Sequence, residues 1–182
     1  ILVLLALVNL AFHLSVLGLI DWPALHILYA ALALIVMIEC VIGGRVIPFF
    51  TTSATPGLKL KLSPRFDYAV LAITALALLT WVARAQGPWN VAVLALAALL
   101  QLLRQLRWAP QKTWRRPILW ILHLAYAWIA LGLALLALAQ AGLVAESAGV
   151  HALGVGATGG LIIGMITRTA RGHTGRALKV GP

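Results

Sequence analysis

The chain has 182 residues, of which 63% are hydrophobic and only 10% are charged. A water-soluble domain of this size cannot cover so much apolar surface, so the composition excludes a soluble protein and indicates that the main solvent is lipid. The net charge of +10 is concentrated in short connections between apolar runs. That distribution is typical of membrane proteins and argues against a nucleic-acid partner.

Six apolar segments are predicted to span the membrane as helices. They cover roughly residues 1–20, 24–44, 66–85, 89–106, 117–139 and 151–168, each close to the ~20 residues that a bilayer requires. Unbroken Leu and Ala runs favour helices over the alternating pattern of a barrel strand. We therefore predict an all-α, polytopic transmembrane bundle that forms a single domain over residues 1–182.

The basic residues predict the orientation of these helices. All Lys and Arg residues except Arg84 lie on one side, in segment 45–65, around 104–116 and from residue 168 onward. The positive-inside rule places that side in the cytoplasm, together with both ends of the chain. Segment 45–65 is expected to be a structured loop, because it holds three prolines and proline does not continue a helix.

Tryptophans are expected to form interfacial belts at both ends of the spans. The outer belt would hold Trp22, Trp81 and Trp89, and the inner belt Trp108 and Trp114. Trp120 and Trp128 lie inside the fifth span and are expected to be packing groups. The chain starts at Ile1 inside an apolar run, without features of a cleavable signal peptide in residues 1–20. We expect it to be the C-terminal half of a longer protein.

Ionisable side chains inside apolar spans are costly, so each is a candidate for a function or a buried partner. A rise of about 1.5 Å per residue sorts them by depth. The predicted outer layer holds His13, His26 and His151, and the inner layer holds Glu39, Cys40 and His123. Haem b needs one or two imidazoles at matching depth, a condition that His26 and His151 meet. Copper favours imidazole and soft sulfur, which the outer histidines or Met37 and Cys40 would supply.

Each of these residues also has a structural interpretation. A single histidine at a membrane interface is more often hydrogen-bonded than metal-bound. Glu39 is either a structural acid or a proton-handling group, and Cys40 is better explained as a small packing residue. Motifs of soluble enzymes and CxxC pairs are absent, and four acidic residues are too few for a carboxylate-rich di-metal site.

The C-terminal segment combines a glycine stripe with a basic cluster. Gly156, Gly160 and Gly164 repeat at the spacing that lets two helices approach closely, and the alternative is a flat face for a porphyrin. Residues 172–176, GHTGR, are expected to form a tight turn after the apolar run, whereas a role in gripping carboxylates is the alternative. Because the predicted topology separates this turn from His151, we expect it to be structural.

Three blocks of this sequence resemble the NnrS family. The first is His26 and Tyr29 followed by GGRVIPFFT at 43–51, the second is HLAY at 123–126 after Pro117, and the third runs from His151-Ala152-Leu153 to Thr167-Arg168 and GHTGR. The resemblance implies a bacterial inner-membrane protein of about twelve helices that carries haem and copper. It also implies a role in nitric oxide metabolism and resistance to nitrosative stress, often alongside denitrification.

The resulting hypothesis is an NnrS-like haem- and copper-binding protein that handles nitric oxide. Its expected ligands are His26 and His151 first, then His123, with His13 lower in rank, and Glu39 would handle protons. The expected partners are lipid, nitric oxide, the N-terminal half of the same protein and a second copy. A proton-coupled carrier is one alternative, although spans free of proline weigh against it. A structural subunit without a metal is the other.

Overall fold

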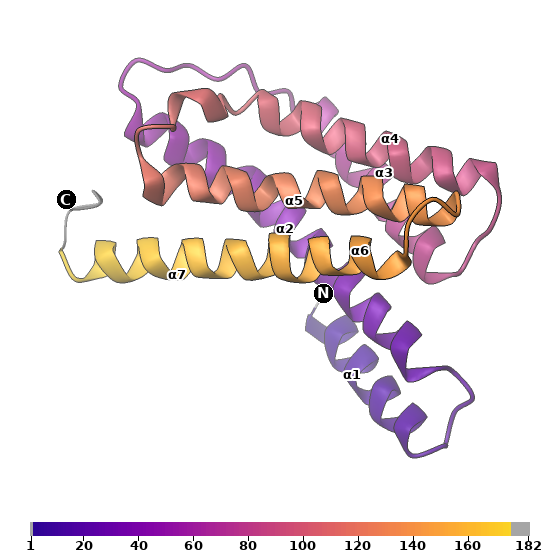
Figure 1. Cartoon of the computed structure of the whole chain (residues 1–182). Helices are drawn as coiled ribbons and strands as arrows, with labels where there is room; N and C mark the ends of the chain where they lie inside the picture. The colour runs from indigo at the N-terminus through magenta and orange to yellow at the C-terminus, as the bar shows by residue number, and fades with distance from the viewer. Residues whose placement is uncertain (1, 176–182) are drawn as a thin grey trace.

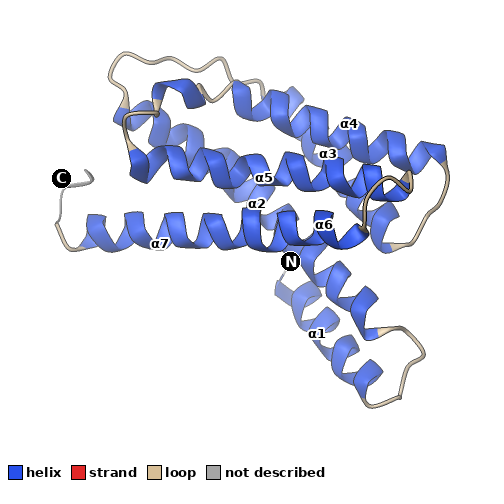
Figure 2. Ribbon diagram, viewed as in Figure 1, coloured by secondary structure: helices blue, strands red, loops and turns tan. Residues whose placement is uncertain are grey.

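The protein is all-helical over residues 2–175, which are the residues that this computed structural model describes (Figures 1 and 2). No strand occurs in that range. In chain order the elements are α1 (Leu2–Val16), α2 (Ala24–Ala54), α3 (Pro64–Val82), α4 (Pro88–Leu106), η1 (Pro110–Lys112), α5 (Pro117–Gln140), α6 (Glu146–His151), η2 (Ala152–Gly159) and α7 (Gly160–His173). The predicted fold class is thereby confirmed.

Among the described residues, five segments are long and apolar enough to cross a membrane. They are Ala24–Ala54, Pro64–Val82, Pro88–Lys112, Pro117–Gln140 and Glu146–His173. The first predicted span is shorter than expected, because α1 has 15 residues and ends at Val16. Gly18 takes a left-handed conformation there (φ 71°), and the Leu19 amide bonds back to the Leu14 carbonyl. This is the geometry with which a glycine closes a helix.

Helix α5 lies at the centre of the bundle. It packs against α4 on one side and against α6, η2 and α7 on the other, and it also contacts α2. Its buried face includes Leu122, Ile129, Leu133 and Leu136, all with 0% of their surface exposed. Helix α1 packs mainly on the first half of α2, and the two project together from the bundle (Figure 1).

Helix α2 continues ten residues past its predicted end, so the prediction of a loop from residue 45 was wrong. The helix runs through Pro48 to Ala54, and the connection to α3 is limited to residues 55–63. A proline inside a helix removes one backbone donor and is tolerated in membranes where neighbouring groups compensate. Pro48 itself is buried against neighbouring helices, and the helix continues after it with Thr51 and Thr52 donating their hydroxyl groups to the carbonyls of Ile47 and Pro48, at 2.9 and 3.2 Å.

The last predicted span also has different limits. Its helix begins at Glu146 rather than at His151, and it continues to His173. Residues 152–159 form a π-helix, an element that is rare and is often found at functional sites. The helix starts earlier at Glu146, whose carboxylate lies in the first helical turn. This carboxylate accepts hydrogen bonds from Trp81 in α3 and from Arg84 in the connection that follows α3.

The two ends of the bundle differ in charge. Segment 55–63, the connection 107–116 and the end of α7 lie together at one end, and the connections 83–87 and 141–145 lie at the other (Figure 1). The described basic residues gather at the first end, and Arg84 stands at the second. This separation is what the charge pattern predicts, and the cytoplasmic placement of the basic end stays a prediction.

The predicted tryptophan belts are confirmed only in part. Trp22, Trp89 and Trp114 are exposed, as an interfacial role requires. Trp81 and Trp108, however, are each only 1% exposed, because both belong to buried polar clusters. Trp128 is a packing group, as predicted, and lies against η2.

Candidate functional site

A cluster of polar and aromatic side chains closes the end of the bundle opposite the basic one. Glu146 accepts a hydrogen bond from the Trp81 indole at 2.7 Å, and Arg84 contacts both of its carboxylate oxygens at 3.1 Å. The Tyr29 ring stacks on Trp81 with centroids 5.0 Å apart, and the His26 ring lies 6.2 Å from Tyr29. The structure thus connects His26 on α2 to the start of α6.

His151, at the end of α6, has a fixed ring orientation. Its Nδ1 atom lies 2.7 Å from the carbonyl oxygen of Ser147, and a carbonyl only accepts hydrogen bonds. Nδ1 therefore carries the ring proton, which leaves the lone pair on Nε2. The side chain is exposed on the bundle surface, directly before the π-helix. A metal-binding histidine has this arrangement, with one ring nitrogen donating to a carbonyl and the other free.

The predicted ligands do not gather into one metal centre. His26 and His151 lie at the same end of the bundle, where His26 lies beside Tyr29 and His151 follows Glu146 in α6. His13 is exposed on α1 beside Phe12, outside the bundle. Among residues 2–175, no three His, Cys, Asp or Glu side chains form a group that would hold a metal ion.

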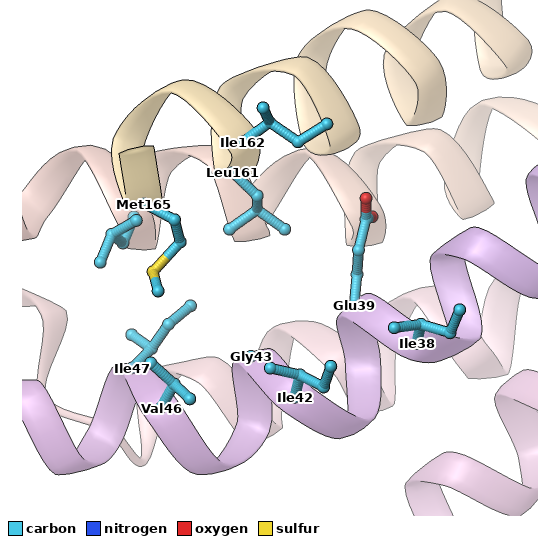
Figure 3. A pocket seen from close by; sticks show the side chains of 10 residues that line it. Ile38, Glu39, Ile42, Gly43, Val46, Ile47, Leu161, Ile162 and Met165 are labelled. Carbon is cyan, nitrogen blue, oxygen red and sulfur yellow. The ribbon is translucent and has the colours of Figure 1, made fainter. Parts of the chain in front are cut away.

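Glu39 faces an apolar pocket between α2 and α7 (Figure 3). The pocket measures about 190 Å³, and Glu39 is the one charged residue among the side chains that line it. Its Oε2 atom and the hydroxyl of Thr158 in η2 are both buried with no other hydrogen-bond partner among the described residues, and the two side chains interact with each other. A carboxyl group in this setting can hold a proton or accept a hydrogen bond from a molecule that enters the pocket.

His123 is buried inside the bundle near the basic end, which agrees with its predicted position in the inner layer. The residue is 3% exposed, its Nε2 atom lies 2.9 Å from the Thr51 hydroxyl, and its backbone carbonyl accepts a hydrogen bond from Gln105. Thr51 also donates to the Ile47 carbonyl, which favours His123 as the donor in their shared bond. The Nδ1 atom is buried without a partner in the described part of the chain.

A buried polar network centred on Arg104 was not predicted, since Arg104 was counted among the loop charges. Its side chain donates to the Asp67 carboxylate at 2.8 Å, to the Cys40 carbonyl at 2.9 Å and to the Tyr126 hydroxyl at 3.1 Å. Gln101 joins the network by donating to the Cys40 sulfur and to Thr74. The recognisable signal is the spacing of Gln101, Arg104 and Gln105, which places three polar residues on one helical face.

The glycine stripe is a packing surface, so the alternative of a flat face for a porphyrin was wrong. A Cβ atom at Gly156 would lie 2.5 Å from the Trp128 ring, one at Gly160 would lie 2.9 Å from Ala125, and one at Gly164 would lie 2.7 Å from Leu122. All three glycines thus lie directly against α5, and no cofactor plane fits between the two helices.

The turn is shorter than the GHTGR motif on which it was expected, because Gly172 and His173 belong to the last turn of α7 and the turn begins after them. Gly175 has a left-handed backbone (φ 68°), and the Thr174 hydroxyl donates to the Ala170 carbonyl at 2.7 Å. Arg176, the last residue of the GHTGR motif, lies outside the described residues.

Comparison with known proteins gives one match. The family model described as NnrS protein matches residues 1–182. Neither the curated proteins nor the solved structures contain a match to the chain. The match covers the blocks around His26, His123 and His151 and the complete helical bundle described above. On this basis the chain belongs to the NnrS family.

Proposed function

We propose that this protein acts in the cellular response to nitric oxide as a haem b-binding protein of the bacterial inner membrane. Family membership supports the general role. The observation that carries the proposal is the geometry of His151, whose Nδ1 atom is committed to the Ser147 carbonyl while the Nε2 side is exposed. A haem iron bound to this histidine would supply a site at which nitric oxide binds.

The described residues fit haem better than they fit copper. Haem iron requires one or two imidazoles, and His151 presents one whose ring is oriented by the hydrogen bond to the Ser147 carbonyl. A copper site requires several converging ligands, and residues 2–175 contain no such group. Cys40, considered as a soft ligand, is buried and accepts a hydrogen bond from Gln101 through its sulfur. Copper therefore has no part in this proposal.

Other residues of the same end would hold His151 in place. Trp81 and Arg84 fix Glu146, and Ser147, whose carbonyl orients the imidazole, is the next residue in the helix. Tyr29 stacks on Trp81 of this cluster, and His26 lies beside Tyr29. His26 therefore provides a second imidazole at the same end of the bundle. Nitric oxide is small and apolar, so a site on a lipid-embedded bundle is accessible to it. Glu39, in its separate pocket, would hold a proton within the same bundle.

The visible absorption spectrum of the purified protein tests this proposal. The protein should show a Soret band that shifts when nitric oxide is added to the reduced form. The variant His151→Ala should lose or shift the band, because the axial imidazole is removed. His13→Ala is the matched control, since His13 is exposed on α1, and its spectrum should be unchanged. A protein without a Soret band in either redox state, or an unchanged band in His151→Ala, would refute the assignment.

A further inference from the structure

A second pocket, distinct from the one at Glu39, lies at the basic end of the bundle. It measures about 740 Å³ and is enclosed by the last turns of α2, segment 55–63 and the first turns of α3, with Arg104 of α4 also in its lining. The site proposed above lies around His151, at the other end of the protein. This pocket therefore needs an explanation of its own.

Positive charge dominates the polar part of this pocket. Arg45, Lys59 and Arg104 line it, against one carboxylate, that of Asp67. Arg45 and Lys59 are exposed, whereas the Arg104 side chain is only 4% exposed. The balance of charge favours an anionic occupant.

The Arg104 guanidinium has a donor to spare. Its Nε atom is used by Asp67, and its Nη1 atom is used by the Cys40 carbonyl and the Tyr126 hydroxyl. Its Nη2 atom has no acceptor among the described residues. A Cβ atom at position 44 would lie only 2.2 Å from this Nη2 atom. Gly44 thus makes room for a buried cation that still has free donors, and such donors bind phosphate oxygens well.

The rest of the lining is apolar. Val41, Leu58, Leu60, Leu62 and Leu71 contribute to it, and Tyr68 stands at its edge with 69% of its surface exposed. An exposed tyrosine is typical of the membrane interface. The pocket therefore combines cations, an interfacial position and a hydrocarbon surface, which together match a molecule with a phosphate group and an acyl chain.

We propose that this pocket binds one anionic phospholipid. The phosphate lies between Arg45 and Lys59 and reaches toward Nη2 of Arg104, and an acyl chain covers the leucines. Basic pockets between membrane helices recognise lipid headgroups by this chemistry. Free inorganic phosphate offers the same charge without the chain, so the test has to separate the two.

The test measures lipid retention by the full chain in detergent. The protein is delipidated, incubated with mixed micelles of phosphatidylglycerol and phosphatidylcholine, and analysed by native mass spectrometry. Wild-type protein should retain one phosphatidylglycerol in preference to phosphatidylcholine. The double variant Arg45→Gln/Lys59→Gln should weaken that retention by about tenfold or more, because each basic group near the surface contributes measurably to anionic lipid binding.

A charge-matched variant serves as the control. Lys112→Gln/Arg115→Gln removes the same charge at the same end from exposed residues outside the pocket lining, and it should retain the lipid as wild type does. Equal loss in both double variants would mean diffuse attraction to a basic surface and would overturn the proposal. Displacement of the lipid by millimolar inorganic phosphate would also overturn it, in favour of a free-phosphate site.

Discussion

Arg104 shows how a single charged residue is accommodated inside the bundle. Its guanidinium contacts a carboxylate from α3, a backbone carbonyl from α2 and a hydroxyl from α5, and it lies 5.4 Å from the centre of the Trp108 ring. One side chain of α4 thus makes polar contacts with three other helices. An ion pair in this position does not stabilise the fold by charge alone, but the loss of one partner leaves a buried charge without compensation.

Asp67→Asn should lower the free energy of unfolding by about 2 kcal/mol, because the neutral amide no longer compensates the buried guanidinium. The Asp67 side chain is 27% exposed, which keeps the loss below that of a fully buried pair. Unfolding by SDS titration in mixed micelles measures it. Asp21→Asn, at an exposed position, should leave the stability unchanged, and equal stability of both variants would contradict the role given to this pair.

At the scale of the elements, the contact between α5 and the segment 146–173 decides what the glycines do. The spacing of Gly156, Gly160 and Gly164 favours close helix packing but leaves a cofactor surface as an alternative. Only the position of Trp128, Ala125 and Leu122 against these glycines distinguishes the two. The π-helix likewise has no clear signal in the sequence, because it depends on how η2 fits against α5 rather than on local propensity.

Two neighbouring glycines in η2 test this packing. Gly156→Ala should lower the free energy of unfolding by about 1–3 kcal/mol, because the new methyl group would overlap the Trp128 ring. Gly154→Ala is the matched control, since no atom lies within 4 Å of a Cβ at that position, and it should not lose stability. Both are compared by SDS titration. If the two variants unfold alike, η2 does not pack on α5 as described.

The whole molecule is organised by the difference between its two ends. One end holds the basic segments and the 740 Å³ pocket, and the other holds the cluster of His26, Trp81 and Glu146. The haem proposal and the lipid proposal therefore concern opposite sides of the membrane. The positive-inside rule assigns the basic end to the cytoplasm.

Cysteine labelling tests this orientation. A membrane-impermeant maleimide should label Asp21→Cys in intact spheroplasts, because the α1–α2 connection would face outward. Lys112→Cys should be labelled only after the membrane is permeabilised. Both positions are exposed, and the native Cys40 is buried and should not react. Labelling in the reverse pattern would invert the topology and place His151 on the cytoplasmic side.

The sequence by itself was sufficient for the fold class, the limits of α4 and α5 to within a residue or so, the gathering of basic residues at one end and the family. These properties follow from hydrophobic length and charge distribution, which act locally along the chain. The end of α2 was not predictable in the same way. Local chemistry argues that Pro48 stops a helix, and the continuation depends on packing against neighbouring helices, where Ile47, Pro48 and Thr51 are buried.

Only the tertiary structure decided which polar residues face inward and what they bind. From the sequence, Arg104 was interpreted as a loop charge, but it is buried in the fold. His13 was a candidate ligand because of its predicted depth, but it lies exposed outside the bundle. The reason is physical. The position of a residue along its helix determines its depth in the membrane. Whether its side chain is buried or faces outward is determined only by the helices that pack beside it.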